Sequence, residues 1–203
     1  MTDQLPSPGD AEYDPDLKVP KCGEVSPTCS TGPLLIKRKG TKMDGGELHS
    51  PNSLDSCTDS NAGEYTYSES IETVTIISGT ADILTKGQTA FITTEVICWG
   101  DGDNDYVDFY YTDDAENPKW NYISSTECSS GESLGNKKWK ISSDSYSLPT
   151  AIGNVQAVRV NLSYRLIEKD ATSTCAHNLD GTAEFYDDVD DVAFVVAEPQ
   201  ELI

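Results

Sequence analysis

The chain has 203 residues and a formal net charge of -21, which comes from 35 acidic and 14 basic side chains. This length suits one β-rich domain around a single hydrophobic core. Because so acidic a surface repels phosphate groups and anionic lipids, nucleic acids and membrane surfaces are poor partners, whereas metal ions, basic proteins and neutral glycans remain good ones.

Residues 1–28 are expected to form an irregular tail or linker. Five prolines stand here among Asp, Glu and Ser, a composition that buries too little apolar surface to offset the entropy of ordering the chain. The start, Met1-Thr2-Asp3, has neither the basic nor the apolar region of a signal peptide. We therefore expect that a leader has been removed or that the chain is a piece of a longer protein. The folded domain is expected over residues 29–203.

Six cysteines without any CxxC pair are spread along the chain, at Cys22, Cys29, Cys57, Cys98, Cys128 and Cys175. Zinc usually takes its ligands as two close pairs, so this spacing favours a disulfide framework. Since disulfides persist in oxidising compartments, the cysteines predict an extracellular or cell-surface protein. Their spacing does not choose among the many possible connectivities.

Short segments of alternating polarity, separated by turn residues, predict an all-β fold of about eight strands. The clearest segment runs from Val158 to Leu166, where we expect one face in the core and the other, with Arg159, Asn161 and Arg165, in water. The other strands are expected at Leu34–Arg38, Ile71–Ile77, Ala90–Trp99, Tyr106–Thr112, Trp120–Ser124, Lys138–Ser142 and Val192–Val196. This pattern predicts an antiparallel β-sandwich or jelly roll, stapled by disulfides. No stretch is long and apolar enough for membrane insertion.

An acidic loop between two of these strands offers a first candidate calcium site. Asp101, Asp103 and Asp105 alternate with Gly and Asn, which is the kind of spacing that aims several oxygen ligands at one calcium ion. The loop matches an EF-hand only in part, because its glycine is displaced and no Glu stands at the twelfth position. A solvated hairpin tip is the equal alternative.

A second acidic cluster directly precedes the last predicted strand. Asp187, Asp188 and Asp190 belong to a run of four carboxylates in five residues, which would repel one another without a cation. This favours a structural calcium ion here, with Glu69 or with Asp55 and Asp59 as further ligands. The alternative is that only one or two of the carboxylates face inward and that the others are charges of an edge strand.

Aromatic residues gather in the middle of the chain. Trp99, Tyr110, Trp120 and Tyr122 are candidates for a ligand surface, because sugars lay their apolar faces on exposed aromatic rings. Packing in the core or at its rim is the alternative. The two histidines, His49 and His177, stand in no catalytic motif, and we expect the protein not to be an enzyme.

Several short segments resemble an accessory β-domain found at the C-terminal ends of secreted bacterial peptidases and in surface proteins of marine protists such as diatoms. The matching segments are Ser53-Leu54-Asp55-Ser56-Cys57, Glu69-Ser70-Ile71-Glu72, Val107-Asp108-Phe109-Tyr110-Tyr111-Thr112, Pro118-Lys119-Trp120-Asn121-Tyr122-Ile123, Gln156-Ala157-Val158-Arg159-Val160 and the run from Tyr186 to Phe194. The resemblance implies a non-catalytic module, similar to carbohydrate-binding jelly rolls whose last strand begins with an acidic, calcium-linked stretch.

The resemblance also implies disulfides from Cys29 to Cys57 and from Cys128 to Cys175. Cys22 and Cys98 depart from its pattern and suggest a third bridge that ties the tail to the sheet. This chain also stands without a peptidase domain, which leaves open whether it anchors an attached enzyme.

Three functions therefore remain open on the sequence. The first is an extracellular binding module, stabilised by calcium, that contacts a glycan or a partner protein. The second is a self-assembling structural protein of a cell-surface appendage, envelope or filament, in which the acidic surface mediates contacts within a homo-oligomer. The third is a secreted hydrolase with an unfamiliar site.

Overall fold

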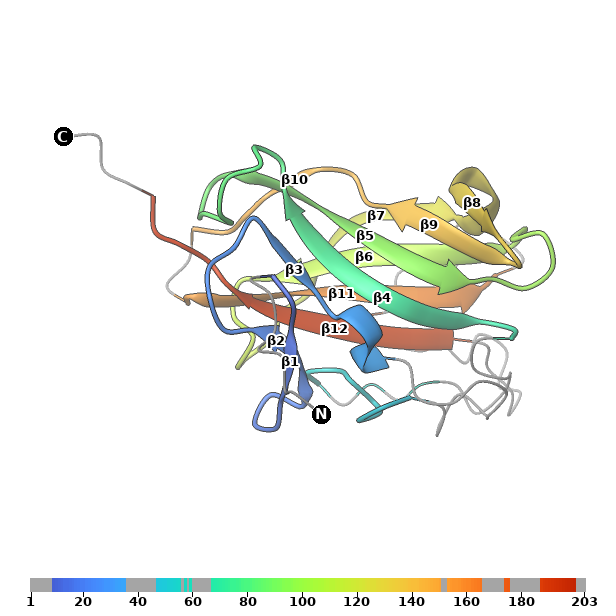
Figure 1. Cartoon of the computed structure of the whole chain (residues 1–203), viewed down its shortest axis with the longest axis horizontal. Coiled ribbons are helices and arrows are strands. Elements are labelled where there is room, and N and C mark those ends of the chain that lie inside the picture. The colour runs from blue at the N-terminus through green and yellow to red at the C-terminus, as the bar shows by residue number, and fades with distance from the viewer. Residues whose placement is uncertain are drawn as a thin grey trace, which may run out of the picture.

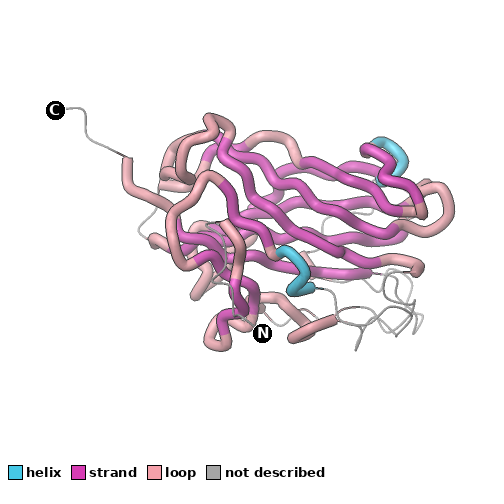
Figure 2. Tube along the Cα trace, in the orientation of Figure 1, coloured by secondary structure: helices cyan, strands magenta, loops and turns pink. Residues whose placement is uncertain are grey.

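A computed structural model describes residues 9–35, 47–55, 57, 59, 67–150, 153–165, 174–175 and 187–199. Within them the chain forms two β-sheets packed face to face, which confirms the predicted all-β sandwich (Figure 1). In the described part of the chain almost all the regular structure is strand, with two short 3-10 helices, η1 (Gly32–Leu35) and η2 (Cys128–Ser130) (Figure 2).

The strands are more numerous than the eight expected. The first sheet has the order β1 (Glu12–Asp14), β2 (Val19–Cys22), β12 (Asp187–Val195), β11 (Val155–Tyr164), β6 (Asp105–Thr112), β7 (Asn121–Glu127). The second has the order β3 (Thr28–Ser30), β4 (Ser70–Ser78), β5 (Thr89–Ile97), β9 (Lys138–Ser142), β8 (Glu132–Gly135), and β10 (Tyr146–Ser147) pairs with β5. Neighbouring strands are antiparallel except β2 and β12, which run parallel with Lys21 opposite Ala193.

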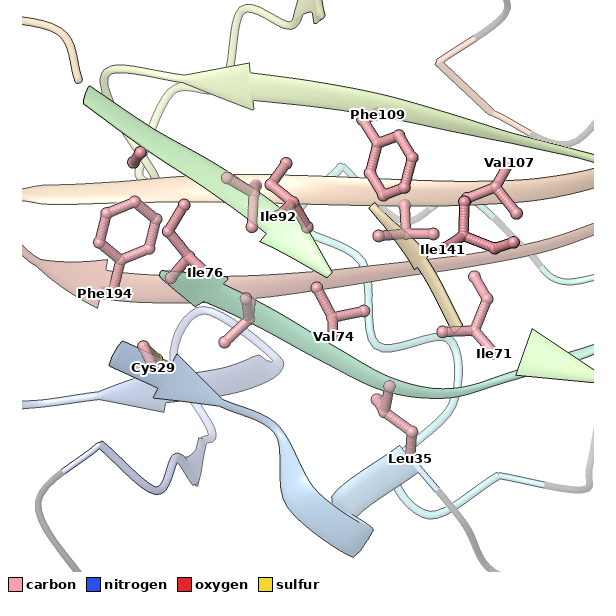
Figure 3. Close-up of a cluster of buried hydrophobic side chains, with 14 of the residues drawn as sticks. Cys29, Leu35, Ile71, Val74, Ile76, Ile92, Val107, Phe109, Ile141 and Phe194 are labelled. Atoms are coloured by element: carbon pink, nitrogen blue, oxygen red, sulfur yellow. The ribbon is translucent and has the colours of Figure 1, made fainter. Parts of the chain in front are cut away.

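The core lies between the inner faces of the two sheets (Figure 3). Phe109 and Phe194 of the first sheet meet Val74, Ile76 and Ile92 of the second, and all five side chains are buried. Alternate residues of the long strands point inward, and most of these positions are apolar, as the sequence pattern predicted.

The expected tail over residues 1–28 is wrong for its described part, residues 9–28, which contributes strands to both sheets. Val19 is fully buried and packs with Ala115, Ala157 and Ala193 in a small apolar cluster. Composition alone misses this, because pairing to β12, the buried side chain of Val19 and the bridge between Cys22 and Cys29 hold the segment in place. The strand expected at Leu34–Arg38 is also wrong in its described part, where η1 ends at Leu35.

All six cysteines form disulfides, as predicted, but the implied pairs are wrong. The bridges are Cys22–Cys29, Cys57–Cys175 and Cys98–Cys128. The positions of the cysteines at strand ends explain why two of these pairs can form. Cys22 ends β2 and Cys29 lies in β3, while Cys98 directly follows β5 and Cys128 directly follows β7. Two of these bridges therefore join the sheets to each other.

The polar face of β11, expected in water, is buried. The side chains of Arg159, Asn161 and Ser163, and that of Arg165 directly after the strand, are almost fully covered. Arg159 pairs with Asp191 of the neighbouring strand, and Arg165 pairs with Asp108 of β6. A buried charge needs such a partner, so the acidic residues of β12 and β6 allow this face to be covered.

Candidate metal centre

Residues 47–55, 57 and 59, which we call the edge segment, lie beside β12 (Figure 1). Among the described residues, strand β2 pairs with β12 at Ala193 and Phe194, and the edge segment borders β12 next to this point. There the amide of Asp191 donates to the carbonyl of Asn52 at 3.0 Å, and the amide of Leu54 donates to Asp191 Oδ2 at 2.7 Å. The edge segment thus takes over the hydrogen bonds of a missing neighbouring strand.

Four carboxyl groups meet where the edge segment crosses the first half of β12. Glu47 and Asp59 come from the edge segment, and Asp188 and Asp190 come from β12. One oxygen each of Glu47, Asp59 and Asp188 lie within 4.8 Å of one another. Asp188 and Asp190 share the inner face of the strand, where they stand opposite the core residues Leu162 and Val160. We call these four residues the carboxylate cluster.

The carboxylate cluster is buried, and several of its oxygens have no hydrogen-bond partner. Asn52 Nδ2 donates to Glu47 Oε2 at 2.7 Å, Ser50 Oγ donates to Asp59 Oδ2 at 2.8 Å, and the amide of Ile71 donates to Asp188 Oδ2 at 2.5 Å. The atoms without a partner among the described residues are Glu47 Oε1, Asp59 Oδ1, Asp188 Oδ1, both carboxylate oxygens of Asp190, and the neighbouring Asn52 Oδ1. Asp190 is 0 % exposed.

These groups repel one another in the absence of a cation. Burial and the neighbouring Asp188 raise the pKa of Asp190 well above its usual value, and burial and Asp190 do the same to the pKa of Glu47. Burial raises the pKa of Asp188 to about 6. No ion pair in the described part of the chain links a basic side chain to any member of the carboxylate cluster.

On the opposite face of β12 the acidic side chains are paired with a basic one, unlike those of the carboxylate cluster. Arg159 Nε donates to Asp191 Oδ1 at 2.7 Å, and the same guanidinium pairs with Asp55 of the edge segment. The ring of Trp120 lies 4.2 Å from the guanidinium carbon of Arg159, and its indole N–H donates to Asp55. The edge segment therefore contacts the ion-paired residues Arg159 and Asp191 on one face of β12, and it contributes to the carboxylate cluster, which has no basic partner among the described residues, on the other face.

The structure divides the predicted metal ligands into three groups. Asp188 and Asp190 belong to the carboxylate cluster, together with Asp59, which the sequence offered as a further ligand. Asp101 and Asp103 are exposed in their loop and join no convergent group of ligands among the described residues.

Glu69, Asp105 and Asp187 are buried at the end of the sandwich that carries this loop. Burial and the charge of Asp105 raise the pKa of Glu69 to about 8, while burial raises that of Asp105 to about 7. Asp105 Oδ2 accepts the amide of Trp99 at 2.5 Å, so its role in the loop is to fix the turn. Glu47 is the member of the carboxylate cluster that sequence reasoning missed, and no spacing rule singles it out.

The aromatic residues predicted as a ligand surface differ in their exposure and in their contacts. Tyr110 is only 2 % exposed and packs edge-on against Tyr122, so it cannot form a platform for a ligand. The ring of Trp120 packs against the guanidinium group of Arg159. Trp99, in contrast, is 51 % exposed, and the Lys137 amine lies 4.3 Å from its ring centre and 5.3 Å from that of Tyr67. Tyr67 is 56 % exposed and was not predicted.

Comparison with known proteins adds no relative: neither the protein-family models nor the curated proteins contain a match to this chain. Among the described residues, no helix has the length and apolar character that crossing a membrane requires.

Proposed function

We propose that this chain is a non-catalytic extracellular binding module in which a calcium ion fastens the edge segment to β12. One observation carries the proposal: Asp190 is fully buried, with both oxygens unpartnered, beside three further buried carboxyl groups. An isolated buried carboxylate costs several kcal/mol, and a bound cation of matching chemistry removes that cost while the cluster stays ionised.

The donor atoms favour calcium over the other common ions. Glu47, Asp59, Asp188 and Asp190 supply five oxygens without hydrogen-bond partners, and Asn52 adds an amide oxygen. Calcium takes six to eight oxygen ligands in irregular arrangements, whereas magnesium demands near-ideal octahedral geometry and zinc prefers His or Cys. All six cysteines are held in disulfides, so no thiolate competes.

An extracellular setting is supported by the three disulfides. Three disulfides persist in oxidising compartments, where free calcium is also abundant enough for sites of modest affinity. An ion bound only by the folded state stabilises it by about 2.7 kcal/mol at a hundredfold excess over its dissociation constant.

The binding surface that we propose is the exposed pair Trp99 and Tyr67, with Lys137 between the two rings. Sugars stack their apolar faces on such rings, and the ammonium group of Lys137 offers a hydrogen-bond donor to hydroxyl groups. Glycans are the proposed ligand, and an exposed aromatic pair of this kind also serves as an anchor for a partner protein.

The test is calcium titration of chelator-treated protein by isothermal calorimetry, with melting curves recorded in parallel. We expect one ion per chain, a higher melting temperature, and much weaker binding of magnesium. No binding heat together with an unchanged melting curve would falsify the calcium proposal. A glycan array probed with wild-type protein and with Trp99→Ala tests the binding surface separately.

A further inference from the structure

The Cys57–Cys175 disulfide lies next to the carboxylate cluster in the chain, since Cys57 is two residues before Asp59. We propose that this disulfide gates the calcium site: its reduction frees the edge segment and weakens calcium binding, and calcium in turn protects the disulfide. This inference rests on the proposed calcium site.

The disulfide ties the distal end of the edge segment to the body of the sandwich. Cys57 is buried, its carbonyl accepts Ser53 Oγ at 2.7 Å, and its sulfur accepts Arg159 Nη1 at 3.1 Å. On the other side of the bridge, the same guanidinium donates to the carbonyl of Thr174. Arg159 thus contacts Cys57 itself and the residue that precedes Cys175, so the bridge and the guanidinium together hold Cys57 two residues before Asp59.

Repulsion between the carboxylates explains why the Cys57–Cys175 disulfide affects calcium binding. When these groups are ionised and no cation is bound, Glu47 and Asp59 of the edge segment repel Asp188 and Asp190 of β12. The disulfide opposes that separation and keeps the ligands close together. An ion bound among them opposes it as well, so the ion and the disulfide favour the same closed arrangement.

Neither of the other two disulfides has this relation to the carboxylate cluster. The Cys22–Cys29 disulfide joins residues that are 7 apart in the sequence, and Cys98–Cys128 joins residues that are 30 apart. The residues joined by Cys57–Cys175 are 118 apart. No cysteine of the first two lies within two residues of a member of the carboxylate cluster. They therefore serve as matched controls within the same molecule.

The reduction needs an external dithiol. The dithiol supplies two electrons and two protons, the bond between the two sulfur atoms breaks to give two cysteine thiols, and the dithiol itself becomes a disulfide. Because binding linkage is reciprocal, the factor by which reduction lowers calcium affinity equals the factor by which calcium shifts the reduction equilibrium.

The first experiment compares calcium affinity in two double variants, Cys57→Ser/Cys175→Ser and Cys22→Ser/Cys29→Ser, by calorimetry. We expect the first pair of changes to weaken binding about tenfold or more and the second to change it less than about twofold. Equal affinity in both variants and the wild type overturns the gating proposal.

A second experiment avoids the risk that a variant does not fold. Oxidised wild-type protein is equilibrated with dithiothreitol at graded concentrations, with calcium or with chelator, and the free thiols are alkylated and assigned by mass spectrometry. Calcium is expected to shift the midpoint for Cys57–Cys175 by about tenfold in reductant and to leave Cys22–Cys29 unchanged. Equal midpoints with and without calcium overturn the gating while the calcium site stands, whereas absence of calcium binding to the oxidised protein overturns both.

Discussion

Arg159 and Asp191 stand opposite each other on β11 and β12 and form an ion pair in which neither side chain is exposed to solvent. Asp191 Oδ2 also accepts the amide of Leu54, and Arg159 also pairs with Asp55. The pair therefore connects two strands of the sheet with the edge segment that covers them.

Replacing Arg159 by methionine is expected to destabilise the protein by about 3–5 kcal/mol, because it leaves Asp191 charged and buried without a partner. Chemical unfolding monitored by circular dichroism measures this. The control is Lys119→Met, an exposed change that should stay within about 0.5 kcal/mol. The double variant Arg159→Met/Asp191→Leu should regain part of the loss, and a loss equal to the sum of the single changes would contradict the coupling.

Replacing Asp190 by asparagine is expected to have opposite effects with and without calcium. In chelator the change removes a buried like charge beside Asp188, so the melting temperature should rise by a few degrees, about 2–4 °C for each kcal/mol gained. In millimolar calcium it removes a ligand, so the melting temperature should fall below that of the wild type. Asp103→Asn, in the exposed loop, is the control and should change neither value. A fall in both solutions would mean that Asp190 stabilises the fold without an ion.

The metal-free protein is expected to lose stability as the pH rises from about 4.5 to about 8. Burial raises the pKa of Glu69 from 4.5 to about 8 and that of Asp105 from 3.8 to about 7, so the folded state holds protons that the unfolded state has released. Each proton must leave a buried carboxyl group as the pH rises through this window, and the resulting penalty is absent below the unfolded pKa.

The variant Glu69→Gln tests this directly, because it removes one of the two titrations. It should be more stable than the wild type at pH 8 by at least ~1 kcal/mol and nearly equal to it at pH 4. Urea unfolding in chelator at both pH values measures the difference, with Glu116→Gln at an exposed position as the control. A pH dependence identical to that of the wild type would show that Glu69 does not contribute.

Two tryptophans are expected to respond to alanine substitution in different ways. Trp120→Ala removes the ring over Arg159 and the hydrogen bond to Asp55, so it should cost about 2 kcal/mol of stability. Trp99→Ala removes a ring that is half in solvent, so it should cost less than about 1 kcal/mol but abolish glycan binding. Glycan binding that survives Trp99→Ala in a folded protein would remove this platform.

Local patterns in the sequence predicted the sandwich and part of the candidate metal centre. The alternation of Val158, Val160 and Leu162 gave the inner face of β11 correctly, since side chains in a strand change sides at every residue. The acidic run, which the sequence placed before the last strand and which forms the first half of β12, brought Asp188 and Asp190 into consideration for the same local reason: repulsion between neighbours is visible in the chain order.

Features that depend on distant segments could not be predicted in this way. A polar face such as that of Arg159 and Asn161 looks the same in sequence whether water or another part of the chain covers it. Its cover is the edge segment, which precedes β11 by about a hundred residues, as the contact between Asp55 and Arg159 shows. Glu47 was missed for this reason, because only the path of the edge segment brings it to β12.

The parallel pairing of β2 with β12 sets a limit on when this sheet can be completed during synthesis. Strand β2 ends at Cys22, and its partner residues Ala193 and Phe194 leave the ribosome some 170 residues later. Until then β2 and β11 both lack the strand that joins them. Such long-range pairing is typical of slowly folding β-proteins, so a nascent or truncated chain without β12 would present open strand edges to its neighbours.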